Sequence, residues 1–585
     1  MHLDVIASQK TELQTNDAIF SLHVTGRNPF ASHGLLLLVA FLSVLTAGTV
    51  KGQDSSPPNV LLILCDDLGY SDIGCYGSEI ETPNLDALAQ HGRRFSQFYN
   101  TARCWPTRGA LLTGYYAQQI RRDSVAGVKS GGQGQRPAWA KLLSDRLKPF
   151  GYHSYHSGKW HIDGLPTKNG FEKSYSLQDH DRHFYPNNHT LDDKPLPAVS
   201  KTDESNSGRV YYTSHEIAKR AIEHLDFHSE RYGESPFFSF VAFTAPHFPL
   251  HAPAETIQKY LERYQKGWES VRAERWEKMQ QFGLGKGVGR LSEVEEQIGP
   301  PYAFPDAMKK LGPLEVNRPV AWESLTQEQQ EFQVAKMAVH AAMVDEMDRA
   351  IGGIIAHLKQ RPGRWENTLV LFLSDNGASA EMMVRGDGHD PQAAPGSGES
   401  YLCLGPGWST VANTPFRRHK TWNHEGGIAT PMIAHWPKGV TSHAKPIETP
   451  RHVVDVVPTI LELAVRAKQN AQSSPTEAVS EGTQKPPAFA GESFLEDLQS
   501  DIAQKGNGLN ERPLWWQHEG NRALRWGEWK IVAAGKDAQW ELYNLNADRS
   551  ETQDLASRYP EVVDRLSKKW NELMEQFTQQ ATSDL

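Results

Sequence analysis

The chain has 585 residues, of which 38% are hydrophobic and 22% are charged, and its formal net charge at pH 7 is −9. A chain of this length exceeds one small core and favours one large domain with a smaller one. The mild, dispersed charge argues against a nucleic-acid-binding groove, and four cysteines are too few for a disulfide scaffold.

The first 52 residues are predicted to be a leader. Residues 34–50 form an apolar run followed by small residues, which is typical of a signal-peptide core with a cleavage site near residues 47–53. We therefore expect an exported protein, periplasmic or extracellular, with no stable membrane span after processing. The alternative is an N-terminal membrane anchor, because the length of the run is borderline for a span.

Strands and helices alternate between residues 53 and 467. Buried apolar runs predict strands at residues 59–67, 237–243, 368–374 and 431–436. Helices are predicted from Pro83 to about residue 92 with Thr82 as cap, at 331–359, and at 454–464 with a kink or opening at Pro458. Such alternation indicates an α/β domain with its sheet inside layers of helices.

A second, smaller unit is predicted at the C-terminal end. Residues 468–505 are polar and loose in composition and are interpreted as a linker and loop. Residues 506–585 contain short aromatic strands at 522–526, 529–532 and 540–545, and then a helix at about 560–577. This order predicts an α+β subdomain, an antiparallel sheet covered by one helix.

Two pairs of oxygen-bearing side chains follow predicted buried strands. Asp66 and Asp67 end the first strand, and Asp375 and Asn376 end the strand at 368–374. Strand ends of this kind gather at one edge of an α/β sheet, and carboxylate and amide oxygens suit Ca²⁺ or Mg²⁺. A lone pair is usually turn or capping chemistry, but two pairs favour a metal site.

Cys104 is predicted to lie at the start of a helix. Pro106 suits the first helical turn, an apolar run follows, and Gly114 is a plausible end. A helix N-terminus favours an anion, and Arg108 lies one turn on, on the same face. A nucleophile, a positive helix end and an arginine at one point suit attack on an anionic ester. The alternative is a buried or free cysteine beside a helix cap.

Three further motifs carry basic side chains. They are Gly158-Lys159-Trp160-His161, Ala245-Pro246-His247-Phe248-Pro249, and Lys420 ahead of Glu425-Gly426-Gly427. A lysine offers charge to an anionic oxygen, and a histidine is a general base near neutral pH. Each motif alone is weak, because such residues are usually solvated or belong to turns.

Taken in order, these motifs resemble the type I, formylglycine-dependent sulfatases, arylsulfatase-like members of the alkaline phosphatase superfamily. The resemblance implies a large mixed sheet sandwiched by helices, with the small C-terminal subdomain. It also implies that a maturation enzyme converts Cys104 to formylglycine. One Ca²⁺ per chain would lie beside residue 104, with the ligand set Asp66, Asp67, Cys104, Asp375 and Asn376. Trp105 and Thr107 depart from the commonest form of the cysteine motif, and Trp105 is expected to crowd the pocket.

The same resemblance implies the roles of the basic residues. Lys159, Lys420 and Arg108 would neutralise the sulfate. His161 would take a proton from the formylglycine hydrate, and His247 would assist the leaving oxygen.

The expected function is hydrolysis of sulfate esters, with an aryl sulfate or a sulfated sugar as substrate. One alternative is a phosphomonoester or phosphonate hydrolase of the same superfamily. Another is a non-catalytic sulfated-glycan-binding protein, if Cys104 stays a thiol. The loop at 179–186 and the insert at 380–419 are expected to line the pocket. The particular substrate, exo or endo action, the oligomeric state and the true start of the chain stay open.

Overall fold

The computed structural model describes residues 56–177, 182–200, 211–299, 305–385, 388–471, 486–500 and 512–584. The predicted leader, residues 1–52, lies outside this set, as do residues 179–181 of the predicted pocket loop and most of the predicted linker. No helix in the described ranges combines the length and the apolar character needed to cross a bilayer.

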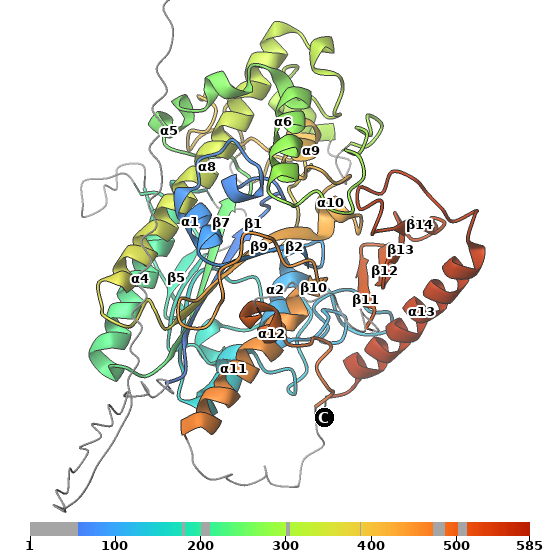
Figure 1. Ribbon diagram of the computed structural model, residues 1–585. Helices are drawn as coiled ribbons and strands as arrows, with labels where there is room; N and C mark the ends of the chain where they lie inside the picture. Colours follow the sequence, from blue (N-terminus) through green and yellow to red (C-terminus); the bar gives the residue numbers. More distant parts are fainter. Residues whose placement is uncertain are drawn as a thin grey trace, which may run out of the picture. The chain divides into compact units, whose positions relative to one another are not determined.

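A mixed ten-stranded sheet runs through the described part of the chain (Figure 1). In spatial order its strands are β10 (Arg451–His452), β2 (Arg93–Tyr99), β9 (Ala429–His435), β8 (Thr368–Ser374), β1 (Asn59–Asp66), β7 (Phe237–Pro246), β3 (His153–Lys159), β4 (Lys173–Leu177), β5 (His189–Leu191) and β6 (Lys194–Pro195). The central strands β8, β1, β7, β3 and β4 are parallel to their neighbours within this group, whereas β9 is antiparallel to both β2 and β8. The predicted α/β class is therefore confirmed, with the antiparallel strand that makes the sheet mixed.

Helices cover both faces of this sheet, and alternate residues of β1 divide the core between them. Leu61 and Ile63 pack with α1 (Pro83–Gln90), α4 (Thr213–Tyr232) and α8 (Gln327–Lys359). Val60 and Leu62 point to the opposite face, against α2 (Cys104–Thr113), α3 (Leu143–Leu147) and α11 (Val456–Ala471). A strand buried on both faces reads as one continuous apolar run, which is why β1 was predictable.

Shorter elements complete the main body. The remaining α-helices there are α5 (Ala254–Gln258), α6 (Gly267–Gln281), α7 (Pro305–Leu311), α9 (Gly405–Ala412), α10 (Glu425–Ile428) and α12 (Leu495–Gln499). The 3₁₀ helices are η1 (Gly74–Tyr76), η2 (Lys148–Phe150), η3 (Pro166–Asn169), η4 (Leu261–Tyr264), η5 (Trp322–Ser324) and η6 (Val453–Asp455).

The C-terminal part is an antiparallel sheet with one helix, as predicted. Its strands are β11 (Leu514–His518), β12 (Asn521–Trp526), β13 (Trp529–Ala533) and β14 (Glu541–Asn544), and its helix is α13 (Pro560–Thr582). The sequence interpretation missed β11. The indole of Trp516 on that strand donates to the Asn100 carbonyl at 2.7 Å, and Lys530 on β13 pairs with Glu425 at 3.0 Å. These contacts join the small sheet to the main body, and the boundaries proposed at 467 and 506 stay predictions.

Three local predictions about helices were wrong in detail. Thr82 precedes α1, but its hydroxyl accepts from the Gly74 amide, and the Asp348 carboxylate takes the helix amides of Asn84 and Leu85 instead. Pro458 does not kink α11, because the helix begins at Val456 and the proline falls in its first turn, where no amide donor is needed.

Helix α8 starts four residues earlier than expected, at Gln327, since Thr326 and Gln329 form a capping box. The helix α11 continues to Ala471, so it includes the first residues of the predicted linker.

Candidate active site

The two oxygen-bearing pairs lie side by side at one edge of the sheet. Strands β1 and β8 are parallel neighbours, with Cys65 opposite Ser374. Asp66 and Asp67 therefore leave the sheet next to Asp375 and Asn376, as predicted. Asp66 is also the register partner of Pro246 on β7, so that His247 follows at the same edge.

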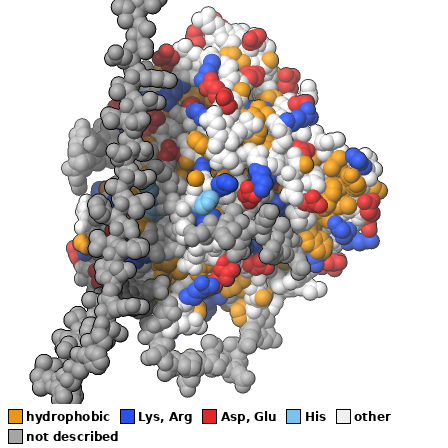
Figure 2. Space-filling view, viewed as in Figure 1, with side chains coloured by type: hydrophobic (Ala, Val, Ile, Leu, Met, Phe, Trp, Pro, Cys, Tyr) orange, Lys and Arg blue, Asp and Glu red, His pale blue; other side chains and the backbone are white. Residues whose placement is uncertain are grey.

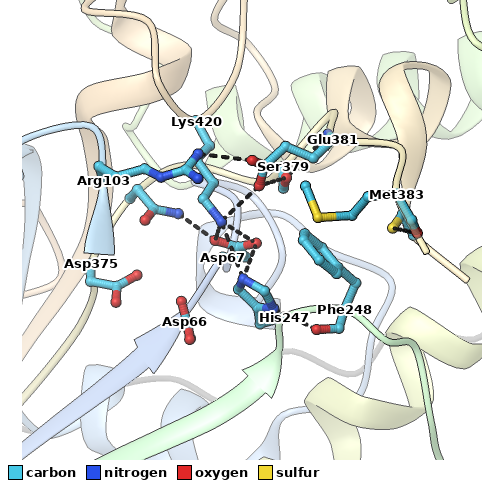
Figure 3. Close-up of polar contacts among 12 residues, drawn as sticks. Asp66, Asp67, Arg103, His247, Phe248, Asp375, Ser379, Glu381, Met383 and Lys420 are labelled. Atoms are coloured by element: carbon cyan, nitrogen blue, oxygen red, sulfur yellow. Dashed lines mark hydrogen bonds and ion pairs between the residues drawn. The ribbon is translucent and has the colours of Figure 1, made fainter. Parts of the chain in front are cut away.

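These four side chains are buried, and their oxygens converge (Figure 3). Asn376 donates its amide nitrogen to Asp67 Oδ1 at 2.6 Å, which leaves its own Oδ1 directed elsewhere. Among the described residues, Asn376 Oδ1 and Asp375 Oδ1 are buried and have no hydrogen-bond donor. Ligand atoms of Asp66, Asp67 and His247 also lie within 4.8 Å of one another. Unsatisfied hard oxygens at one buried point fit a divalent cation.

Burial perturbs the carboxyl groups of this cluster. It raises the pKa of Asp375 to about 7, and the charge of Asp66 adds to the effect. It likewise raises the pKa of Asp67 to about 6, although Lys420 opposes the shift. Carboxylates crowded together in a dry site favour the protonated form until a cation joins them.

Cys104 is the first residue of α2 and is 1% exposed. The preceding loop is fixed by Thr107, whose hydroxyl accepts from the Thr101 amide at 3.0 Å. Gly114 ends the helix with φ 80°, in the left-handed conformation that glycine adopts without strain. The predicted helix and the place of the cysteine at its N-terminus are therefore confirmed, and Thr107 has a hydroxyl-dependent role at this site.

Arg108 connects the cysteine helix to both pairs of strands. Its Nε and Nη2 lie 2.9 and 2.8 Å from Asp375 Oδ2, and its Nη1 donates to the Lys159 carbonyl at 2.7 Å. Burial alone would lower the pKa of Arg108, but Asp375, Asp66 and Cys104 outweigh it and raise the pKa. The guanidinium thus stays charged close to the cysteine.

The motif around Lys159 and His161 ends strand β3, which the sequence analysis did not predict. Lys159 Nζ lies 2.5 Å from Asp66 Oδ2, and both side chains are 1% exposed. His161 has φ 52°, and its ring centroid lies 5.8 Å from that of Trp105, the residue after Cys104. The motif therefore reaches the cysteine helix and the carboxylates together.

His247 and Lys420 meet over Asp67. Lys420 Nζ lies 2.8 and 2.9 Å from the two carboxylate oxygens of Asp67, and 3.3 Å from His247 Nε2. The Phe248 carbonyl is 2.5 Å from His247 Nδ1 and must accept, so Nδ1 carries a proton and Nε2 of a neutral ring faces Lys420. Burial would lower the pKa of Lys420, but Asp67 and Glu381 outweigh it and raise the pKa.

Two charged residues of the site were missed by the sequence analysis. Glu381 is fully buried and contacts Lys420 at 3.0 Å and Arg103 at 2.9 Å. The Arg103 guanidinium lies 5.2 Å from the ring centroid of Trp105. Trp105 also neighbours the ring of His518 at 5.4 Å, so this residue forms a wall with other side chains. A charge next to Cys104 and an acid six residues after Asp375 were the available signals.

The described parts of the predicted pocket loop and insert line a common cavity of about 430 Å³. Its walls include Arg182, Tyr185, Asn187, His389, Asp390 and Glu399. The His183 ring contacts the His247 carbonyl at 3.2 Å, which places this loop beside the catalytic candidate.

Comparison with known proteins identifies the family. A family model described as Sulfatase matches residues 58–466. The chain belongs to the sulfatase family. The sulfatase is 30% identical over 564 residues to an uncharacterized sulfatase of Schizosaccharomyces pombe, covering 89% of this chain and 94% of the relative. It is 33% identical over 462 residues to an arylsulfatase of Klebsiella aerogenes, covering 73% and 91%.

A solved structure supports the same fold. The sulfatase resembles the crystal structure of Ps i-CgsB in complex with k-i-k-neocarrahexaose with a TM-score of 0.60 and 21% identity, covering 90% of this chain and 94% of that one. The sulfatase is therefore a sulfuric ester hydrolase with the alkaline phosphatase-like sandwich and C-terminal subdomain expected from the sequence.

Proposed function

We propose that this sulfatase hydrolyses sulfate esters at residue 104, with Cys104 converted to formylglycine and one Ca²⁺ bound beside it. The observation that carries the proposal is the meeting of basic and acidic side chains at the N-terminus of α2. Arg108, Lys159 and Lys420 each contact a carboxylate of Asp375, Asp66 or Asp67 there. No ordinary core needs three buried cations at one helix end.

The residues present fit the proposed cation. Asp66, Asp67, Asp375 and Asn376 would hold it through their oxygens, and the two unsatisfied oxygens of Asp375 and Asn376 support this set. The sequence-based set also included residue 104, which begins the adjoining helix. When bound, Ca²⁺ supplies positive charge to a sulfate oxygen.

The basic side chains are suited to hold the sulfate. Arg108 is fixed by Asp375, and Lys159 and Lys420 reach the cluster from β3 and from the segment before α10. Preorganised charges in a dry site stabilise a developing negative charge strongly, and loss of one such donor costs about 10²–10³ in rate.

The two histidines are suited to move protons. Nε2 of His247 faces the cluster while its Nδ1 is fixed by a carbonyl, so Nε2 is the atom that would carry a proton to the leaving oxygen. His161 lies beside the residue that follows Cys104 and would take a proton from residue 104. Formylglycine hydrate would supply one hydroxyl for attack on sulfur and a second for release of sulfate.

We further propose an aryl sulfate or a sulfated sugar as substrate. The supporting observations are the arylsulfatase relative, the sugar ligand of the fold neighbour, and the polar cavity next to His247. Export to the periplasm or the outside, and maturation by a formylglycine-generating enzyme, remain proposals that rest on the leader and on the motif at Cys104.

The test is the mass of the peptide that spans Cys104, from protein made in its native host or with a maturation enzyme. We expect a peptide lighter by the difference between a thiol and an aldehyde, together with turnover of an aryl sulfate well above that of the matched aryl phosphate. An unmodified cysteine in fully matured protein would support the glycan-binding alternative. Preference for the phosphate would support the phosphoester alternative.

A further inference from the structure

Glu381 is a buried acid that contacts two basic residues of the site (Figure 3). Its Oε1 lies 2.9 Å from Arg103 Nη1, and its Oε2 lies 3.0 Å from Lys420 Nζ. The Ser379 hydroxyl donates to Oε2 at 3.0 Å. The carboxylate is therefore fixed at both oxygens, in an orientation that faces Lys420.

Lys420 is shared between two acids. Its ammonium touches Glu381 and, on the other side, both oxygens of Asp67 at 2.8 and 2.9 Å. Those Asp67 oxygens are among the atoms proposed to hold the cation. An ammonium and a divalent ion repel one another and compete for the same carboxylate.

Glu381 offers Lys420 a second site that does not involve the proposed metal ligands. Lys420 and Arg103 hold the pKa of Glu381 well below its usual range, against the effect of burial, so this acid stays ionised. A buried lysine that lost its only acidic partner would be strongly destabilised, whereas one with a second partner would not.

We propose that Glu381 is a positioning residue that keeps Lys420 in the sulfate pocket while Asp67 binds the metal ion. The inference rests on the proposed function, because it assumes that a cation occupies the carboxylate cluster. Without the charge of Glu381, Lys420 depends on Asp67 alone and competes with the cation for it.

The test measures Ca²⁺ affinity by titration calorimetry on full-length protein, with every variant carrying the same form of residue 104. We expect Glu381→Gln to weaken Ca²⁺ binding about tenfold, a factor equivalent to about 1.4 kcal/mol. The double variant Glu381→Gln with Lys420→Met removes the competitor, so Ca²⁺ affinity should return at least to that of the unmodified chain.

A matched control separates this role from general stability. Glu315 is also fully buried, and it pairs with Lys336 at 2.6 Å. Glu315→Gln should lower the melting temperature but leave Ca²⁺ affinity unchanged. Glu381→Asp keeps the charge and should retain Ca²⁺ affinity to within about threefold, which provides a second reading if the glutamine variant folds poorly.

The outcomes are distinct. Unchanged Ca²⁺ affinity in Glu381→Gln, or a double variant as weak as Glu381→Gln, would overturn the role of Glu381 while leaving the metal site standing. A wild-type chain that binds no Ca²⁺ would overturn both the metal part of the proposed function and this inference.

Discussion

Arg108 holds Asp375 through two nitrogens that both approach Oδ2, at 2.9 and 2.8 Å, and leaves Asp375 Oδ1 without a hydrogen-bond donor among the described residues. One carboxylate therefore serves two purposes. Oδ2 fixes the arginine of the cysteine helix, and Oδ1 is available to a cation. The cysteine helix and the metal candidate are in this way joined by a single side chain.

Arg108→Lys should reduce kcat/KM by about 10²–10³, because a lysine cannot reproduce the two-nitrogen contact with Asp375. It should also lower the free energy of unfolding, since both partners are 0% exposed. Steady-state kinetics and thermal unfolding would measure the two effects. The control is Arg220→Lys, at a partly exposed pair with Glu216 on α4, which should change stability by less than about 0.5 kcal/mol. Full activity in Arg108→Lys would contradict the charge role.

Cys104→Ala should abolish turnover while the fold survives, because alanine is well tolerated in a first helical turn and only the nucleophile is lost. Activity on an aryl sulfate and circular dichroism would be compared in the same preparation. Cys75→Ala provides the control, as Cys75 is a free cysteine away from the carboxylate cluster. Retained activity in Cys104→Ala would exclude this residue as the nucleophile.

Asp375→Ala should remove Ca²⁺-dependent stabilisation. A ligand that binds the folded state raises the melting temperature, so wild-type protein should melt higher with Ca²⁺ than after exhaustive chelation. In Asp375→Ala the two melting temperatures should coincide, and activity should fall. A wild-type melting temperature and activity that do not respond to chelation would rule out the metal role.

The pH dependence of Ca²⁺ binding follows from the raised pKa values of Asp375, about 7, and Asp67, about 6, which arise mainly from burial. Such groups bind more protons folded than unfolded, so metal-free protein should lose stability as pH rises from about 4 through 7. Ca²⁺ requires the ionised carboxylates, so its affinity should rise over the same window. We expect binding at least about tenfold weaker near pH 5.5 than near pH 7.5 by calorimetry. A flat profile would contradict protonation of these groups.

His247→Asn should slow poor leaving groups more than good ones. If His247 protonates the leaving oxygen, an alkyl sulfate depends on it far more than an aryl sulfate whose phenol is acidic. The measurement is the ratio of kcat/KM for the two ester classes in wild type and variant. An equal loss for both classes would indicate that His247 only positions Lys420, which lies 3.3 Å away.

The sequence by itself determined the local elements and the chemistry they carry. Continuous apolar runs predicted β1, β7 and β8, and Pro106 with Gly114 predicted α2 with Cys104 at its start. The same runs did not reveal β2 and β3, because those strands contain mainly polar and aromatic residues. The adjacency of the acidic pairs was also predictable, since parallel strands end at one edge of a sheet.

Only the tertiary structure decided which charges meet. Lys420 and Asp67 are 353 positions apart, and nothing local marks Glu381 among the 70 acidic residues of the chain. The partner of a buried charge is chosen by the packing of distant segments, because desolvation makes an unpaired charge costly wherever the fold encloses it. Sequence motifs therefore named the groups that act on sulfate, and the fold assigned the acid that keeps one of them in place.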